Sequence, residues 1–193
     1  FEDSKFQALT LYYDKNNDGK LQAWEAALVT ELELSGQSIK SLRGIEYFTE
    51  LESLNCTSNL LTSLDVTNNR KLRALWCKSN RIVSLDVTPL RDLQILNCES
   101  NRLTSLDVSQ NTELVHLLCG MNNGAMTDDD GITKIDVSNN PKLETLSVYY
   151  LNLSELDGTN NPSLKKLDFG MCCHTRWGDL TPIEHIDLSR NPE

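Results

Sequence analysis

Apolar residues recur along most of the chain at positions that repeat every 21 residues. The segment LESLNCTSNLLTSLDVTNN, which starts at Leu51, is followed by LRALWCKSNRIVSLDVTPL and LQILNCESNRLTSLDVSQN. In the first copy, the apolar Leu54 and Cys56 alternate with the polar Ser53 and Asn55. Side chains that alternate in this way predict a short strand with one buried face and one free face.

A strand of about five residues cannot bury its apolar face alone. Successive copies can bury it by stacking in parallel, about 4.8 Å apart, which builds a solenoid with one coil per repeat. The consensus LxxLxCxxNxLxxLDV[ST]xN, with its repeat length and its fixed Asn, resembles the leucine-rich-repeat family. The resemblance extends over nearly all residues from Val29 onward, where VTELELSGQSIKSL (29–42) would form a divergent first coil.

This resemblance implies an α/β repeat fold: a right-handed solenoid with about seven parallel strands on its concave face and a short helical N-terminal cap. The predicted domains are the cap, residues 1–28, and the leucine-rich-repeat solenoid, residues 29–193. Two coils are longer than the others, with insertions near 123–131 and 170–182. Both insertions follow the predicted strand of their coil, so we expect them to emerge at the same edge of the solenoid.

Two positions of the repeat hold the same residue type in four coils. The third strand position holds Cys four times and then Val148 and Phe169, so it favours a buried apolar group rather than a disulfide or a reactive thiol. The turn after the strand holds an Asn whose buried amide can satisfy backbone groups of neighbouring coils. Leu151 and Cys172 interrupt the asparagine series. The cysteines are Cys56, Cys77, Cys98 and Cys119, and the asparagines are Asn59, Asn80, Asn101 and Asn122.

A different pattern precedes the repeats. Potential oxygen ligands occupy positions 1, 3, 5, 7, 9 and 12 of a twelve-residue loop that has Gly19 at position 6. This pattern is similar to the EF-hand loop, in which alternate residues wrap Ca²⁺, position 7 contributes its backbone carbonyl and position 12 binds with both carboxylate oxygens. A solvated Asp and Asn turn is the alternative. The candidate metal ligands are Asp14, Asn16, Asp18, Lys20, Gln22 and Glu25.

The residues on either side of this loop predict two short helices, the first of them capped by Ser4. Their apolar side chains can cover the first coil, so we interpret residues 1–28 as a structural, calcium-braced cap. A single loop of this type is expected to bind Ca²⁺ weakly, with a dissociation constant on the order of 10⁻⁴ to 10⁻⁵ M. The covering residues would be Phe6, Leu9, Tyr13, Trp24 and Leu28.

Composition narrows the class of partner and the location. The formal net charge of −10 argues against nucleic acid or an anionic membrane surface as a partner. No run of about 18 or more apolar residues occurs, so no membrane span is predicted. The loop together with LxCxxNxLTSLDVS repeats resembles exported, internalin-like proteins of bacteria, which implies an extracellular or cell-surface location. We expect a monomer that has lost any export signal and that continues beyond Glu193.

The free face of the later strands and the neighbouring turns are unusually apolar and aromatic for an exposed surface. This face would be concave, and concave faces are where repeat proteins usually bind. The two insertions would flank Tyr149 and Tyr150, which predicts a composite site of two loops over these tyrosines. The candidate ligand-binding residues are Trp76, His116, Leu118, Met121, Tyr149, Tyr150 and, in the second insertion, Trp177.

The sequence contains no catalytic triad, phosphate loop or pair of catalytic acids. Cys172, Cys173 and His174 lack the paired spacing of a zinc site, and the run from Asp128 to Asp130 is interpreted as a solvated loop. The sequence therefore predicts a non-enzymatic recognition module that binds a protein or a glycan on a host or bacterial surface. A structural spacer without its own ligand, within a larger surface protein, is the alternative.

Overall fold

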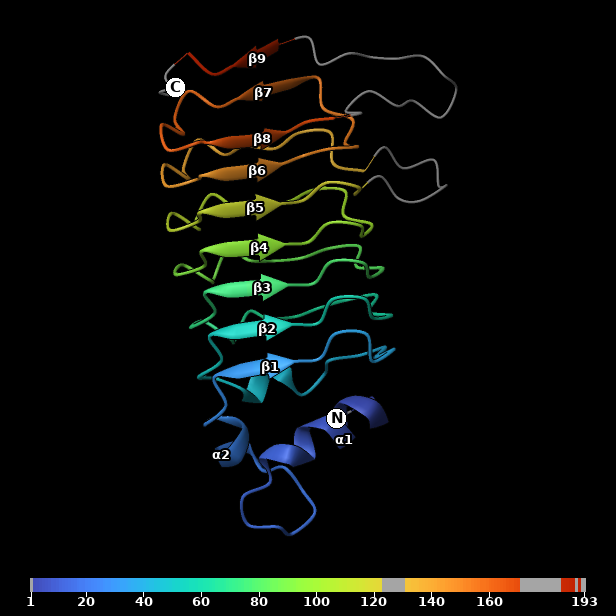
Figure 1. Ribbon diagram of the computed structural model, residues 1–193. Helices are drawn as coiled ribbons and strands as arrows, with labels where there is room; N and C mark the ends of the chain where they lie inside the picture. Colours follow the sequence, from blue (N-terminus) through green and yellow to red (C-terminus); the bar gives the residue numbers. More distant parts are fainter. Residues whose placement is uncertain (1, 123–130, 171–184, 190, 192–193) are drawn as a thin grey trace.

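The computed structural model describes residues 2–122, 131–170, 185–189 and 191, which form a solenoid of stacked coils (Figure 1). Seven strands form one parallel sheet in the order β1-β2-β3-β4-β5-β6-β8. The predicted leucine-rich-repeat fold with about seven parallel strands is therefore confirmed. The strands are β1 (Glu31–Glu33), β2 (Ser53–Asn55), β3 (Ala74–Trp76), β4 (Ile95–Asn97), β5 (His116–Leu118), β6 (Thr145–Ser147) and β8 (Lys166–Asp168).

Neighbouring strands of this sheet pair without offset. Leu32 lies opposite Leu54, and Leu54 lies opposite Leu75. The middle residue of each strand from β1 to β6 is buried, whereas the first residue faces the free side of the sheet. Equivalent residues of successive coils therefore form straight columns along the solenoid.

A second, two-stranded parallel sheet was not predicted. It pairs β7 (Glu155–Asp157) with β9 (His185–Asp187), so that Leu156 lies opposite Ile186. Both strands come from the second half of their coils. The equivalent segments of the earlier coils carry the same apolar pattern but form no strand, so periodicity alone does not distinguish them.

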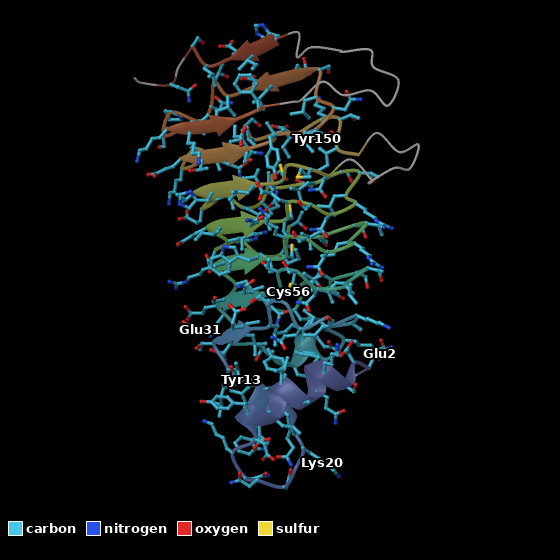
Figure 2. All side chains as sticks on the ribbon, turned by 45° about the vertical axis from the view of Figure 1, so that its right-hand side comes forward. Glu2, Tyr13, Lys20, Glu31, Cys56 and Tyr150 are labelled. Carbon is cyan, nitrogen blue, oxygen red and sulfur yellow. The ribbon has the colours of Figure 1, made fainter. Side chains whose placement is uncertain are left out.

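The four repeated cysteines form a buried column, as predicted. Each lies one residue after a strand, is a free thiol and has no solvent-exposed surface. Figure 2 shows the sulfur atoms stacked above Cys56 along the solenoid. Val148 fills the same position after β6 and is also fully buried, so this position requires a compact apolar group and not a thiol.

The predicted asparagine ladder is present in the turns that follow the strands. Asn80 accepts a hydrogen bond from the Leu61 N–H at 3.0 Å and donates from Nδ2 to the carbonyl oxygens of Cys56 and Cys77, both at 3.0 Å. One amide thus joins its own coil to the preceding one. Leu151, which interrupts the series, is buried and makes the position apolar. The same pattern of bonds recurs at Asn59, Asn101 and Asn122.

A second asparagine ladder runs through the other turn of the coils and was missed. Asn69 donates from Nδ2 to the carbonyl oxygens of Ile45 at 2.8 Å and Phe48 at 2.9 Å. Leu90, also buried, interrupts this ladder in one coil. The sequence feature that indicates this ladder is the last Asn of the repeat consensus, for which no structural role was predicted. The other members are Asn111, Asn140, Asn161 and Asn191.

The N-terminal cap consists of α1 (Ser4–Thr10), the 3-10 helix η1 (Leu11–Tyr13) and the single turn α2 (Ala23–Ala26). A further 3-10 helix, η2 (Ile45–Tyr47), belongs to the first coil of the solenoid. Asp3, rather than Ser4, caps α1, because its carboxylate accepts hydrogen bonds from the backbone N–H groups of residues 5 and 6. Asp3 also accepts a bond from the Lys40 N–H at 2.7 Å, which ties the helix to the first coil.

Only part of the predicted apolar cover forms. Phe6 is fully buried with its ring centroid 6.2 Å from that of Phe48, and the Tyr13 hydroxyl donates to the Glu31 carbonyl oxygen at 3.1 Å (Figure 2). The prediction is wrong for three residues, which are exposed: Leu9 at 36%, Trp24 at 52% and Leu28 at 54%. Glu25 and Ala26 are the buried residues of α2. Trp24 within α2 and Leu28 in the turn after it are left exposed to solvent.

Candidate functional site

The free side of the seven-stranded sheet presents two columns of side chains. The first and third residues of each strand alternate with the buried leucines, so their order along the solenoid follows from the strand register. The first column is Glu31, Ser53, Ala74, Ile95, His116, Thr145 and Lys166. The second column is Glu33, Asn55, Trp76, Asn97, Leu118, Ser147 and Asp168.

Apolar and aromatic residues gather in the middle of these columns. Ile95 lies opposite His116, and Asn97 lies between Trp76 and Leu118 in the second column. All four apolar or aromatic residues are partly exposed. We call Trp76, Ile95, His116 and Leu118 the central patch. Three of the predicted ligand-binding residues, Trp76, His116 and Leu118, are thus neighbours on one face.

A polar cluster lies beside the central patch, two residues past the strands. Glu99 is only 4% exposed, and its carboxylate accepts bonds from Lys78 Nζ at 2.8 Å and from the Ser147 hydroxyl at 3.3 Å. Burial raises the pKa of Tyr149, and the nearby Glu99 charge raises it further. The cluster therefore consists of the Lys78–Glu99 ion pair, Ser147 and the partly buried Tyr149.

The predicted residues Met121 and Tyr150 lie at the bend that follows. Both adopt the left-handed backbone conformation, with φ of 55° and 59°, and Met121 is 40% exposed. The equivalent residue in three earlier coils is a serine with the same φ: Ser58, Ser79 and Ser100. A bulky residue in this conformation is uncommon, and such residues cluster at functional sites. Figure 2 places Tyr150 near the upper coils of the solenoid.

Part of the predicted composite site lies outside the described residues. This applies to Trp177, to Cys172, Cys173 and His174, and to most of the two insertions, including the run 128–130. The described part of the predicted site is therefore Trp76, His116 and Leu118 of the central patch together with Met121, Tyr149 and Tyr150.

Sequence reasoning missed a hollow at the N-terminal end of the concave face. Its volume is about 600 Å³, and its lining includes Glu31 and Glu33 from β1, Ser53 and Asn55 from β2, and Trp76 from β3. We call it the N-terminal hollow. No motif along the chain marks this hollow, because its lining comes from three different coils. The signal lay across the strands, where two carboxylates and one indole face the same side.

The predicted calcium loop bends sharply at Gly19 and closes onto its first aspartate, Asp14. Gly19 has φ of 80°, and its N–H donates to Asp14 Oδ2 at 2.8 Å. Asp14 Oδ1 is buried and has no hydrogen-bond partner among the described residues. The Asn16 and Asp18 side chains accept bonds from backbone N–H groups two residues further on. An unpaired buried carboxylate oxygen is a feature that a cation would satisfy.

Glu25 fits calcium binding less well. Its side chain is buried, and its two oxygens accept bonds from the Lys15 and Gln22 N–H groups, both at 2.8 Å, and from the Asn16 N–H at 3.3 Å. Within the described residues, no three His, Cys, Asp or Glu side chains lie close enough together to hold a metal. Bidentate binding by Glu25 would have to replace these backbone bonds, so calcium binding stays a prediction.

The buried cysteines are poorly suited to nucleophilic chemistry. Burial raises the pKa of the Cys77 thiol to about 12 and that of Cys56 and Cys98 well above the usual value. A thiolate is the reactive form, so these thiols are inert at neutral pH. No helix in the described part of the chain is long and apolar enough to cross a membrane.

Comparison with solved structures identifies the fold. The functional domain of InlJ from Listeria monocytogenes, which includes a cysteine ladder, is 32% identical over 99% of this chain, with a TM-score of 0.68. The internalin InlF from the same organism is 22% identical over 86% of this chain, with a TM-score of 0.66. A plant peptide hormone receptor, RGFR1, in complex with RGF2 is 20% identical over 72% of this chain, with a TM-score of 0.62.

These neighbours are longer than this chain, which covers 46% of the InlJ domain, 56% of InlF and 24% of RGFR1. No protein-family model matches the sequence, and none of the curated proteins does. The neighbours nevertheless support an internalin-like leucine-rich-repeat fold, and the buried column of Cys56, Cys77, Cys98 and Cys119 corresponds in kind to the cysteine ladder of the InlJ domain.

Proposed function

We propose that the solenoid is a non-enzymatic recognition domain that binds a protein ligand on its concave sheet. The observation that carries this proposal is the central patch of Trp76, Ile95, His116 and Leu118, which is partly exposed amid polar columns. Aromatic and aliphatic side chains on a preformed face are the usual anchors of protein interfaces. A complex of the plant receptor with its peptide supports the same use of the fold, although that receptor shares only the fold.

The polar cluster beside the patch extends this surface. Tyr149 is an amphipathic aromatic side chain whose ring packs against Gly120 and lies near Glu99, which is itself hydrogen-bonded to Ser147. A side chain that is held in place before binding loses little conformational entropy in a complex. We therefore include Tyr149, with Tyr150 and Met121 on the adjoining bend, in the proposed surface.

A capture experiment tests the proposal. The wild-type domain and a Trp76→Ala, His116→Ala, Leu118→Ala variant would be immobilised and exposed to extracts of host and bacterial surface proteins. The matched control replaces two apolar residues that are 54% exposed elsewhere, Tyr47→Ala and Val83→Ala. We expect the same proteins to be retained by the wild type and the control and lost by the triple variant.

Three other results would contradict the proposal. Equal capture by all three proteins would place the binding surface elsewhere. If the wild type retains nothing above the control matrix, the domain acts as a spacer. Retention of oligosaccharides on a glycan array, with loss in the triple variant, would instead assign the same surface to a glycan.

We also propose an extracellular location, on the basis of the internalin neighbours. Brief protease treatment of intact source cells tests it: a surface-exposed domain is degraded or released, whereas a domain inside an intact membrane is spared. A cytosolic marker protein provides the control for cell integrity.

The N-terminal loop is proposed to bind Ca²⁺ as a structural brace. The support is the sequence pattern together with the unpaired, buried Oδ1 of Asp14. The ion would be held by Asp14, Asn16, Asp18, the Lys20 carbonyl, Gln22 and Glu25, after Glu25 exchanges its bonds to backbone N–H groups.

A further inference from the structure

The N-terminal hollow has an uneven lining that follows from the strand register. Glu33, Asn55 and Trp76 are consecutive members of one column, and Glu31 and Ser53 are neighbours in the other. Adjacent strands lie about 4.8 Å apart, so Glu33 and Trp76 stand about 10 Å apart at the backbone. The small Ser53 and the short Asn55 between them leave the hollow, of about 600 Å³, open to solvent.

One wall of this hollow carries two carboxylates without a cationic partner. Among the described residues, neither Glu31 nor Glu33 forms an ion pair, whereas three glutamates beside later strands do. Glu52 pairs with Arg73, Glu99 with Lys78 and Glu144 with Lys165, at 3.8, 2.8 and 2.8 Å respectively.

The side chain of Glu33 and the backbone of Glu31 are held in place. Glu33 accepts bonds from the Ser35 N–H at 2.8 Å and from Asn55 Nδ2 at 2.7 Å. Partial burial opposes ionisation of Glu33, but these hydrogen bonds outweigh it and lower its pKa. The Tyr13 hydroxyl fixes the Glu31 carbonyl. The Glu33 carboxylate is thus preformed and anionic at neutral pH, with the exposed Glu31 side chain beside it.

The opposite wall is the indole of Trp76. Its ring can stack on a cationic group, and this attraction is greatest for Trp among the aromatic side chains. Two unpaired carboxylates facing an indole across a solvent-filled hollow complement a group that is both cationic and partly apolar. A neutral sugar could stack on the indole, but it would leave both negative charges unbalanced.

We infer that the N-terminal hollow seats a lysine or arginine side chain of the protein ligand. The cationic group lies between the Glu31 and Glu33 carboxylates and the face of Trp76. This inference rests on the proposed function, since it names the chemistry of one part of the ligand that the concave face binds.

The position of Trp76 adds a constraint on that ligand. Trp76 lines the hollow and also belongs to the central patch, where Leu118 lies two strands further along the same column. The ligand segment therefore presents a basic residue next to apolar residues and runs across the strands. Its apolar part covers Ile95 and Leu118 while its basic residue enters the hollow.

The hollow can be tested without knowing the ligand. The probes are an acetylated, amidated Arg-Gly-Arg peptide and its citrulline counterpart, in which each guanidinium is replaced by a neutral group of the same shape. The readout is the indole N–H resonance of Trp76, assigned by its loss in Trp76→Phe. The exposed Trp24 provides an internal control resonance within the same spectrum.

We expect the arginine peptide to shift the Trp76 resonance and the citrulline peptide to leave it unchanged. Glu31→Gln with Glu33→Gln should weaken the apparent affinity at least tenfold, and added salt should weaken it further. Glu155→Gln, an exposed carboxylate on β7, is the matched control and should bind like the wild type. The single variant Glu31→Gln serves as a folding control. No hydrogen bond is described for the Glu31 carboxylate, so this substitution should weaken arginine binding without disturbing the fold.

Equal shifts with the two peptides, or unchanged arginine affinity after removal of both carboxylates, would overturn the inference. A shift caused by a neutral oligosaccharide that persists in Glu31→Gln with Glu33→Gln would assign the hollow to a sugar. These results are independent of the capture experiment. If the triple variant loses its captured protein while the hollow ignores arginine, only the inference about the hollow fails.

Discussion

The ring of Tyr149 lies against Gly120. A Cβ atom at Gly120 would stand 2.5 Å from Cδ1 of that ring and 2.7 Å from the Tyr149 carbonyl oxygen. Because the second of these atoms belongs to the backbone, the obstacle could not be relieved by a rotamer change. The absence of a side chain at Gly120 is therefore what lets Tyr149 take its place next to Glu99.

Gly120→Ala is expected to displace Tyr149 and to lower the free energy of unfolding by about 1–3 kcal/mol, the usual cost of overpacking. The matched control is Gly170→Ala, at the equivalent position two coils further on, where the one atom of the described residues that a Cβ would meet is Asp168 Oδ1 at 3.6 Å. Urea unfolding measures both variants. Equal stability of the two would show that the Tyr149 ring is not held as described.

Asn101→Ala is expected to cost about 1–3 kcal/mol of unfolding free energy for the polar groups it leaves unpaired. This substitution leaves the buried Ile82 N–H without an acceptor and removes the donor to the Cys77 and Cys98 carbonyl oxygens. Asn69→Ala should cost less, because Asn69 only donates and its Oδ1 has no partner among the described residues. The exposed Asn68→Ala is the control and should be neutral. The order of the three urea midpoints checks the two ladders.

Acid is expected to destabilise the solenoid through a column of aspartates. Hydrogen bonds from Thr67 lower the pKa of Asp65, and those from Ser109 and Ser138 lower the pKa of Asp107 and Asp136. A folded-state pKa below the unfolded value of about 3.9 adds stability that is fully present above that pH. This stability is lost as pH falls through the folded-state pKa. Melting temperatures that stay constant from about pH 5 to pH 2 would contradict this prediction.

The four stacked thiols are expected to resist labelling while the protein is folded. Burial raises the pKa of Cys77 to about 12, and all four sulfurs lack exposed surface. N-ethylmaleimide at neutral pH should leave the peptides that contain these cysteines unmodified, as measured by mass spectrometry. The same peptides should be labelled fully in urea. Rapid labelling of Cys77 in the folded protein would show that the column opens to solvent.

Calcium is expected to raise the melting temperature if the N-terminal loop binds it. At a free concentration one hundred times the dissociation constant, binding contributes about 2.7 kcal/mol to the folded state. Asp14→Asn with Asp18→Asn should abolish the effect, whereas Asp65→Asn, in a turn on another part of the solenoid, should retain it. Glu25 is a poor test position because it also holds three backbone N–H groups. No shift up to about 10 mM calcium, at which the expected weak site would be filled, would exclude the brace.

The parts of the fold that repeat could be predicted from the sequence, because each repeated position reports the same environment several times. Cys56, Cys77, Cys98 and Cys119 identify one buried position, and Asn80 with its equivalents identifies one turn. The same logic could have revealed the ladder that begins at Asn69. The orientations of Trp24 and Leu28 could not be obtained in this way, because the cap occurs once and has no second copy to confirm a reading.

The candidate site was predicted in part for the same reason. The strand register places Trp76, His116 and Leu118 on one face once the repeat is aligned. The N-terminal hollow depends on residues that differ from coil to coil: two glutamates, a serine, an asparagine and a tryptophan. Their proximity arises only when the strands are laid side by side, so no pattern along the chain indicates it.

Because the strands of the concave sheet pair without offset, equivalent residues of successive coils are evenly spaced along the solenoid. Along their shared column, the distance from Glu33 to Leu118 is a whole number of strand spacings, each of about 4.8 Å. Removal or duplication of one complete coil between them would shorten or lengthen that distance by one strand spacing and leave the residues at both ends unchanged. Ligands of different length could thus be matched by changing the number of coils, with no redesign of the residues that grip them.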